Sequence, residues 1–337
     1  MTKIAIAGVM ENIGREILSF FEQDGVSVDD IIALEPKAPI GTMVSYGEDD
    51  DLDVFNLDDF DFARADIVIF ATSEEISKRY ITKAQTTGVK IVDCSGATFT
   101  DQDVPMIVYG VNDANISNAK KNIVSVPSAF VTQVLQPLAK VNQDLSIIRL
   151  NINAYISTSV YGKEAMDELF NQTRKIYMNS SLVDDETVFK KQIAFNVLPQ
   201  VGEFIGEETK TEWEINAQIK KVLGGNMKIH ANCAFVPAFI GAGMFVNAEC
   251  LNEVDADNVR ALMQQTKGVV VFDKQVDGGY VSLTDVQGEE EIYVSRVRQD
   301  LSVENGFSFW VVADNLRAGM AKNAFNVTKM LLNVLER

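Results

Sequence analysis

The feature that most constrains the fold is a strand that runs directly into a helix between Asn122 and Leu138. This stretch reads NIVSVPSAFVTQVLQPL; its apolar strand ends at Pro127, and helical spacing begins after Ser128. Enzymes hold nucleophiles at such junctions, because the amides and positive dipole of a helix N-terminus lower a thiol pKa and stabilise an oxyanion. The residue at this junction is Ala129, which can neither attack nor transfer a proton. The junction is therefore either an ordinary turn or a vacated active site.

Composition restricts the class of protein and its partners. A chain of 337 residues suits two domains. The formal net charge of -18 repels phosphate backbones and anionic lipid surfaces, so we expect no nucleic acid and no membrane partner. No signal-peptide pattern and no apolar run of membrane-spanning length is found. Cys94, Cys233 and Cys250 are odd in number and show no CxxC spacing, which predicts reduced thiols in the cytoplasm rather than disulfides or a metal site.

The first part of the chain alternates strands and helices. The patterns predict strands over 3–8, 29–35, 66–71 and 89–93, with helices over 12–21 and 74–86. This order predicts an α/β fold with a Rossmann-like, doubly wound sheet and a dinucleotide site at its carboxyl edge. The aspartate-rich segment 47–61 fits a solvated loop or sheet edge better than a metal site, because no histidine or ordered ligand spacing accompanies it.

From about residue 145 the strands become longer. The patterns predict strands over 146–158, 227–248, 286–298 and 306–313, and helices over 163–177, 211–223 and 314–335. This order is typical of an α+β domain with a mixed or antiparallel sheet. The run CAFVPAFIGAGMFV, within 229–248, is too hydrophobic for a solvated sheet face. We expect a homodimer interface to cover it.

A glycine turn follows the first strand and has two interpretations. Gly8 and Gly14 are the outer glycines of a dinucleotide loop, but Glu11 stands where the middle glycine belongs. A carboxylate there opposes a pyrophosphate by about 1–4 kcal/mol. Glu35 ends the second strand, where an acid accepts ribose hydroxyls and disfavours a 2'-phosphate. The turn is either a residual NAD site or a structural turn kept for helix packing, and we expect NAD or NADP binding to be weak or absent.

Four stretches together resemble the aspartate-semialdehyde dehydrogenase family. They are the glycine turn, IVDCS at 91–95 with Val104-Pro105 following, QIAFNVLPQ at 192–200, and FWVVADNLR at 309–317. The resemblance runs essentially end to end. It implies an NADP-dependent, phosphorylating aldehyde dehydrogenase fold of amino-acid biosynthesis, whose chemistry passes through a cysteine thioester. It also implies a dinucleotide-binding-type Rossmann domain over 1–128, completed by the C-terminal helix 314–337, and an α+β central dimerisation domain over 129–313.

The family's functional residues do not carry over to the matching positions. The nucleophilic cysteine falls at Ala129, the substrate-positioning glutamine at Ile156, the phosphate-binding arginine at Phe99, the substrate-clamping arginine at Phe235, the general-base histidine at Ala242, and the glutamate and lysine around Thr211 and at Glu214, with Glu212 as a possible carboxylate. Apolar filling removes the cost of an unpaired buried clamp. The pattern therefore predicts no catalytic residue at these positions, and a protein with a binding, dimerisation or regulatory role that pairs with itself or with an active paralogue.

The alternative is an NAD(P)-dependent oxidoreductase acting on an aldehyde or acyl phosphate, with another residue as nucleophile. Cys94 could serve as a substitute thiol, although a buried small hydrophobe is its commoner role. Ser128 has no predicted base beside it and fits a helix N-cap. His230, the only histidine, fits an ordinary strand residue, and Arg296 and Arg298 fit structural ion pairs.

Overall fold

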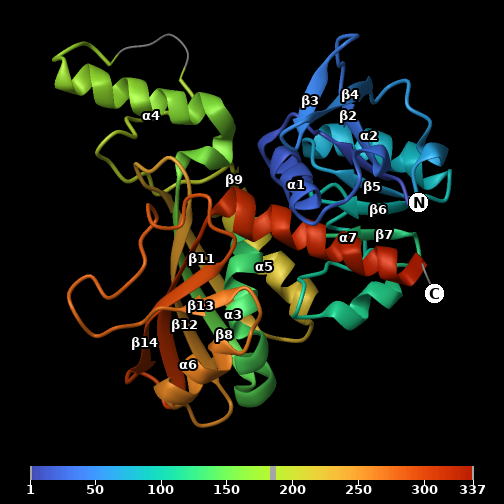
Figure 1. Cartoon of the computed structure of the whole chain (residues 1–337). Helices are drawn as coiled ribbons and strands as arrows, with labels where there is room; N and C mark the ends of the chain where they lie inside the picture. The colour runs from blue at the N-terminus through green and yellow to red at the C-terminus, as the bar shows by residue number, and fades with distance from the viewer. Residues whose placement is uncertain (1, 183–186, 336–337) are drawn as a thin grey trace. The chain divides into compact units, whose positions relative to one another are not determined.

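The structure is a computed structural model that describes residues 2–182 and 187–335. Its described residues divide into two compact units. The first unit holds the chain up to Thr132, the short segment 221–223, and the chain from Leu316 onward. The second unit holds residues 133–220 and 224–315 (Figure 1).

The first unit is built on a seven-stranded sheet in the order β3-β4-β2-β1-β5-β6-β7. Its strands are β1 (Ile4–Ala7), β2 (Ile31–Glu35), β3 (Met43–Tyr46), β4 (Asp50–Asn56), β5 (Ile67–Phe70), β6 (Lys90–Asp93) and β7 (Ile123–Ser125). All neighbouring strands are parallel except the pair β3 and β4. With α1 (Asn12–Gln23) after β1 and α2 (Glu74–Gln85) after β5, the predicted Rossmann-like, doubly wound fold is confirmed.

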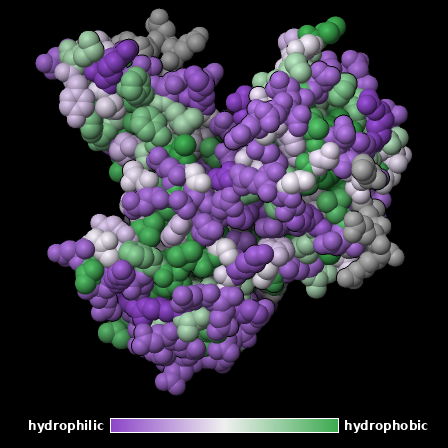
Figure 2. Space-filling model, viewed as in Figure 1, coloured by the Kyte–Doolittle hydropathy of each residue, from purple (hydrophilic) through white to green (hydrophobic). Residues whose placement is uncertain are grey.

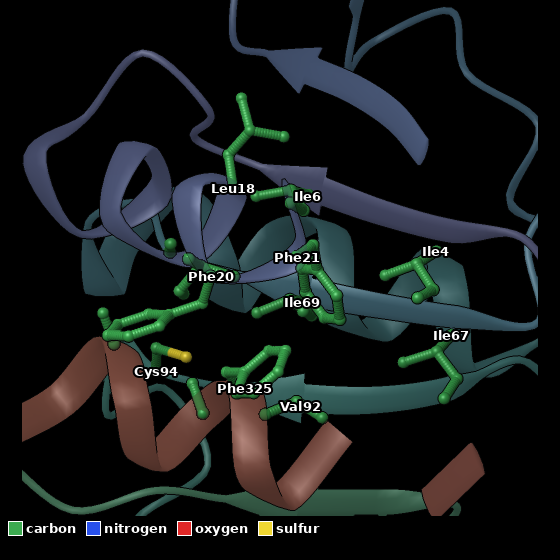
Figure 3. Packing of buried hydrophobic residues seen from close by; sticks show 14 of the residues in the cluster. Ile4, Ile6, Leu18, Phe20, Phe21, Ile67, Ile69, Val92, Cys94 and Phe325 are labelled. Atoms are coloured by element: carbon green, nitrogen blue, oxygen red, sulfur yellow. The ribbon is translucent and has the colours of Figure 1, made fainter. Parts of the chain in front are cut away.

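The core of this unit explains why its strands are apolar throughout. Parallel strands are covered on both faces, so side chains of both orientations are buried. In β1 every residue is buried. On one face, Phe20 and Phe21 of α1 point toward Phe325 of α7 (Lys322–Leu335), with ring centroids 5.7 and 5.1 Å apart (Figure 3). The predicted C-terminal helix thus belongs to this core, but it begins as a π-helical segment, Asn315–Ala321.

The aspartate-rich segment forms the second strand of the sheet, next to the edge strand β3. It contains β4, which pairs in antiparallel register with β3. Leu52 and Val54 point inward and are buried, whereas Asp51 and Asp53 alternate outward. The aspartates are solvated, but the segment is neither a loop nor the sheet edge, because β4 pairs with β3 on one side and β2 on the other. The hairpin was missed because the aspartates masked its alternation.

The second unit is built on a six-stranded mixed sheet in the order β11-β8-β12-β15-β14-β13. Its strands are β8 (Ile147–Ile156), β11 (Lys228–Phe235), β12 (Ala242–Cys250), β13 (Val269–Val271), β14 (Ile292–Asp300) and β15 (Gly306–Ala313), with a hairpin of β9 (Phe204–Ile205) and β10 (Glu208–Thr209). The helices are α3 (Ala129–Leu145), α4 (Gly162–Tyr177), α5 (Lys210–Leu223) and α6 (Ala256–Gln264). Short 3-10 turns lie at Val28–Asp30, Phe62–Arg64, Asp113–Asn118 and Thr158–Tyr161. The mixed sheet was predicted, whereas α6 was missed.

Two predicted boundaries in this unit were wrong. The single strand over 227–248 is two strands, β11 and β12, separated by the segment 236–241. The strand predicted to start at Val286 begins at Ile292, after a turn at Gly288 with a positive φ of 81°.

The chain itself covers most of the apolar run in β11 and β12. Cys233, Phe235, Met244 and Val246 are buried within the single chain, whereas Phe239 is exposed and Phe245 is partly exposed. Burial within one chain therefore explains much of the hydrophobicity that we assigned to a partner. Phe245 lies on a sheet face that stays open. Along β8 buried residues alternate with partly exposed Asn151, Asn153 and Tyr155.

The visible surface is mostly hydrophilic, as the strongly acidic composition requires (Figure 2). Exposed apolar side chains gather on the α4 part of the second unit, where Phe170, Tyr177 and Met178 are largely exposed. Within the part of the chain that the structure describes, no helix has both the length and the apolar character to cross a membrane.

Candidate functional site

The predicted strand-to-helix junction is formed. β7 ends at Ser125 and α3 begins at Ala129. The carbonyl of Ser128 accepts hydrogen bonds from the N–H groups of Val131 and Thr132, at 3.1 and 3.2 Å, which starts the helix. A Cβ placed on Gly319 would lie 2.6 Å from the Cβ of Ala129. The junction therefore holds a buried methyl group, packed against the backbone of the C-terminal segment.

Three further positions lie side by side in one row across the second sheet. Phe235 of β11 pairs with Ile156 of β8, and the same Ile156 pairs with Ala242 of β12. These are the positions where the resemblance puts the family's clamping arginine, glutamine and histidine. Their exposed fractions are 1%, 0% and 0%, respectively. The structure thus brings the three residues together, and each presents a fully buried, apolar side chain.

Aromatic side chains surround Phe235. Its ring centroid lies 4.9 Å from that of Tyr161 and 5.1 Å from that of Phe189. The Tyr161 hydroxyl accepts a hydrogen bond from the N–H of Gly202 at 2.7 Å, which fixes the ring. An arginine at this position would have to place its guanidinium group within this aromatic cluster, away from water.

The loop that carries Phe99 is held by Asp93. The buried carboxylate accepts hydrogen bonds from the N–H and hydroxyl of Ser95, at 2.9 and 2.6 Å, and from those of Thr98, at 2.8 and 2.6 Å. Asp93 ends β6, so the loop is fixed to the carboxyl edge of the first sheet. The loop is therefore built as a rigid holder, but it presents a buried phenylalanine where the resemblance expects a phosphate-binding arginine.

A lysine that we did not single out lies beside this loop. The Nζ of Lys221 donates to the carbonyls of Phe99 and Asp101 at 2.6 and 2.7 Å. Burial lowers the pKa of Lys221, opposed in part by the charges of Asp101 and Asp93. The two carbonyls leave Nζ one N–H to offer. In the sequence, what could have pointed to Lys221 is its place directly before the apolar Val222, which the structure shows to be buried.

Glu212 has a structural role in the described chain. Its side chain and that of Thr209 form a capping box at the start of α5. Its other carboxylate oxygen accepts the N–H of Cys233 at 2.9 Å. Glu214 forms an ion pair one turn away with Lys210, at 3.6 Å. Both acids therefore serve the helix, and Glu212 has its two oxygens engaged by backbone N–H groups.

The glycine turn is tightly packed. A Cβ on Gly14 would lie 1.9 Å from the carbonyl oxygen of Gly8, so only glycine lets α1 approach the turn this closely. Gly8 has a positive φ of 88°, and a Cβ there would lie 2.8 Å from the oxygen of Ala71. Glu11 is the exposed N-cap residue of α1, and its side chain makes no capping hydrogen bond. Packing alone thus explains both glycines, and a carboxylate stands at the helix N-terminus.

Glu35 lies at the end of β2, as predicted. One of its oxygens accepts the N–H of Met10 at 3.0 Å. Burial raises the pKa of Glu35, the hydrogen bond from Met10 lowers it, and the nearby charge of Glu11 raises it further. The acid therefore supports the turn, and it stands at the end of the second strand, where an acid binds ribose hydroxyls in dinucleotide sites. The residues around the turn fit a dinucleotide in part, with Glu11 opposed to it.

None of the three thiols is activated. Cys94 lies in the core of the first unit (Figure 3), and burial and then the charge of Asp93 raise its pKa well above the usual value. Burial raises the pKa of Cys233 to about 12 and that of Cys250 to about 11. A nucleophilic cysteine needs the opposite shift. The structure therefore favours Cys94 as a buried small hydrophobe.

The remaining candidates are strand residues and a cap. His230 is an exposed residue of β11. The ion pairs predicted for Arg296 and Arg298 are not found within residues 2–182 and 187–335. The N-cap role of Ser128 stays a prediction. Among the described residues no group of histidine, cysteine, aspartate and glutamate is arranged to hold a metal ion.

Comparison with known proteins agrees with this architecture. Family models describe residues 3–119 as a semialdehyde dehydrogenase NAD binding domain and residues 135–318 as a semialdehyde dehydrogenase dimerisation domain. The chain is 35% identical over 340 positions to the aspartate-semialdehyde dehydrogenase of Rickettsia bellii, covering 98% of this chain and 99% of that protein. The aspartate semialdehyde dehydrogenase II of Vibrio cholerae, crystallised with ASA, superposes with a TM-score of 0.93 at 28% identity, over 99% and 98% of the two chains.

A Rossmann-like unit followed by a mixed-sheet dimerisation domain defines the chain as a semialdehyde dehydrogenase fold. With matches of this extent, the chain belongs to the aspartate-semialdehyde dehydrogenase family.

The aromatic cluster around Phe235 can be tested through stability. We expect Phe235→Arg to lower the free energy of unfolding by roughly 3–5 kcal/mol, because it buries an uncompensated charge. Phe235→Leu, the apolar control, should cost about 1 kcal/mol. Both tryptophans, Trp213 and Trp310, lie in the second unit, so urea unfolding followed by tryptophan fluorescence reports on it. Equal stability of the arginine variant and wild type would show that the site is open to water.

Proposed function

We propose that this chain is a catalytically inactive member of the aspartate-semialdehyde dehydrogenase family, with a binding, dimerisation or regulatory role. The observation that carries the proposal is the row of Phe235, Ile156 and Ala242. Their register shows that the sheet still brings these three positions together. Their side chains offer no charge, no hydrogen bond and no proton. The scaffold of a site is therefore present without its reactive groups.

The physical argument concerns coupled groups. Acyl transfer through a thioester needs a nucleophile, a base that accepts its proton, and cations that hold the anionic substrate. Ala129 and Ala242 provide neither of the first two. Phe99 and Phe235 stand where the cations would be. The ammonium group of Lys221 already donates to two backbone carbonyls, so it has one N–H left for an anion. Positioning groups that act together are worth several orders of magnitude in rate, so their joint replacement supports inactivity.

A second candidate function is an NAD(P)-dependent oxidoreductase acting on an aldehyde or acyl phosphate. The end-to-end similarity to chains named aspartate-semialdehyde dehydrogenase favours it, as does the NAD binding domain. It requires a nucleophile that we do not find among the described thiols, whose pKa values are raised. The two candidates differ in whether any aldehyde is turned over.

Partners and location follow from the same family membership. The dimerisation domain supports a homodimer, and an active paralogue with the same domain would offer a matching surface. The three cysteines are unpaired, which supports a reducing compartment such as the cytoplasm.

The first test of the proposal is the family reaction itself. We expect no phosphate-dependent oxidation of aspartate semialdehyde by the purified protein. Ala129→Cys combined with Ala242→His should stay inactive, because Phe99, Ile156 and Phe235 would still fail to hold the substrate. The measurement is NADPH or NADH formation in a coupled absorbance assay. Turnover by the wild type would establish the second candidate, and near-family rates in the double variant would refute the positioning argument.

The second test concerns the cofactor. Glu11 lies where the helix dipole would favour a pyrophosphate, and its charge outweighs a dipole contribution of about 0.3–1 kcal/mol. We expect weak or absent binding of NAD and NADP to the wild type. Glu11→Gly should strengthen binding by about fivefold or more, with NAD preferred because Glu35 repels a 2'-phosphate.

Calorimetric titration of both cofactors checks this expectation. Glu11→Gln is the matched variant, since it removes the charge and keeps the Cβ. A gain in both variants assigns the effect to charge, whereas a gain in Glu11→Gly alone assigns it to backbone approach. Tight NADP binding by the unmodified protein would contradict the roles given to both glutamates.

The third test concerns assembly. We expect a stable homodimer at micromolar concentration, with the open sheet face of β8 and β12 in the interface. There Tyr155, Phe245 and Trp310 form an aromatic cluster, with centroids 4.9 to 6.4 Å apart. Phe245→Glu should shift the mass from light scattering toward one chain, while Phe204→Glu on the β9-β10 hairpin should not. A monomeric wild type would exclude the homodimer.

A further inference from the structure

A cavity lies in the second unit, and its lining includes none of Phe235, Ile156 and Ala242. It has a volume of about 690 Å³ and is bordered by the segment 273–280 and by β14. Four of its lining residues are cationic: Arg260, Lys274, Arg296 and Arg298. Two are acidic, Asp273 and Asp277. A cavity of this volume is in the range that holds small organic ligands.

A β-bulge places the two arginines of β14 on this cavity. Ser295 pairs with Trp310 and Arg298 with Ser308, so two residues of β14 oppose a single residue of β15. Arg296 is the extra residue and has a φ of 58°, in the left-handed region. In a regular strand its side chain would follow the sheet face, whereas the bulge redirects it. Both arginines therefore line one cavity.

Asp273 holds the bulge in place. Its two carboxylate oxygens accept the backbone N–H groups of Arg296 and Val297 at 2.7 and 3.1 Å. The Nε of Arg260 donates to the same carboxylate at 2.7 Å, and its Nη1 donates to Asp257 at 2.7 Å. Arg260 and Asp273 compensate each other, and the side chain of Asp273 is only 5% exposed. The floor of the cavity is thus a rigid hydrogen-bonded network.

The other cations of the cavity have no carboxylate partner within the described ranges. Arg298 donates only to the carbonyl of Arg296, at 3.5 Å, and the Nζ of Lys274 lies 4.9 Å from the centre of the Phe272 ring. Arg296 forms no side-chain hydrogen bond or ion pair in this part of the chain. Against these three cations stand the exposed Asp277 of the lining and Asp300 of β14, whose pKa is lowered mainly by hydrogen bonds from Ser302 and also by the charge of Arg298. The cavity is therefore positive on a chain whose net charge is -18.

We propose that this cavity binds a phosphorylated small molecule through Arg296 and Arg298. Guanidinium groups offer paired N–H donors that match phosphate oxygens, and they stay charged at any physiological pH. The volume exceeds what a phosphate group needs. Val276 and Tyr280, both at least half exposed, line the remainder and suit an apolar or ring-containing body. This site is separate from the proposed loss of catalysis and does not depend on it.

Calorimetric titration at low ionic strength tests the proposal, with inorganic phosphate and phenyl phosphate as probes and benzoate as the carboxylate comparison. We expect saturable binding of phenyl phosphate, tighter than that of inorganic phosphate or benzoate. The double variant Arg296→Gln/Arg298→Gln should weaken phenyl phosphate binding by about tenfold or more. Raising the ionic strength to about 0.15 M should weaken it in the wild type, because the cations are exposed.

Arg174→Gln provides the matched control. Arg174 is an exposed arginine of α4 in the same unit and lies outside the cavity. The Arg174→Gln variant should bind phenyl phosphate as tightly as the wild type does. The single variant Arg298→Gln leaves the bulge residue Arg296 in place and should weaken phenyl phosphate binding by about threefold or more. It therefore tests the proposal even if the double variant misfolds. Absent or non-saturable binding by the wild type, equal binding by the arginine variants, or an equal loss in Arg174→Gln would each overturn the proposal.

Discussion

The pairing of β8 with a neighbour on each side is the constraint on which the second unit depends. Its parallel ladder with β11 and its antiparallel ladder with β12 fix the register of three strands at once. A slip of one residue would turn every buried side chain of a strand to the open face. Register therefore keeps Phe235, Ile156 and Ala242 in one row, whatever side chains they carry. Such a scaffold can keep its geometry when the reactive side chains are replaced.

The same constraint explains how the apolar replacements are tolerated. The row lies at the ends of its three strands, but all three side chains are buried, so a charged side chain there needs a partner or a substrate. Phe235 instead packs with Tyr161 and Phe189, and Ile156 and Ala242 are completely enclosed. At these positions stability favours apolar side chains, whereas binding an anionic substrate favours charged ones. In this chain the side chains are apolar.

Much of the fold could be predicted because local patterns and tertiary burial agree. β1, β5 and β15 are uniformly apolar and bounded by turn residues, and each was found at its predicted place. Where the two disagree, prediction failed. The aspartates of β4 alternate with buried apolar residues but have low strand propensity, so the hairpin was missed. The segment 236–241 contains two strand-breaking residues, Pro237 and Gly241, but its other side chains are apolar, and the break between β11 and β12 was missed.

The candidate site could be predicted only in part, for a related reason. The resemblance located Ala129, Phe235 and Ala242, but no sequence pattern shows that two of these share a row with Ile156. Lys221 and the bulge at Arg296 were missed, because backbone carbonyls and a distant aspartate create them. Three-dimensional contacts that join residues far apart in the chain leave no local periodicity.

The close approach of Gly14 to Gly8 has a consequence for how such chains are recognised. Because no side chain fits between the turn and α1, substitution at Gly14 is blocked by geometry, whether or not a nucleotide is bound. The motif would persist through neutral drift in a lineage that had abandoned the cofactor. Its presence in a genome is therefore a record of ancestry. Evidence of present-day use must come from positions that packing leaves free to change, of which Glu11 is the nearest.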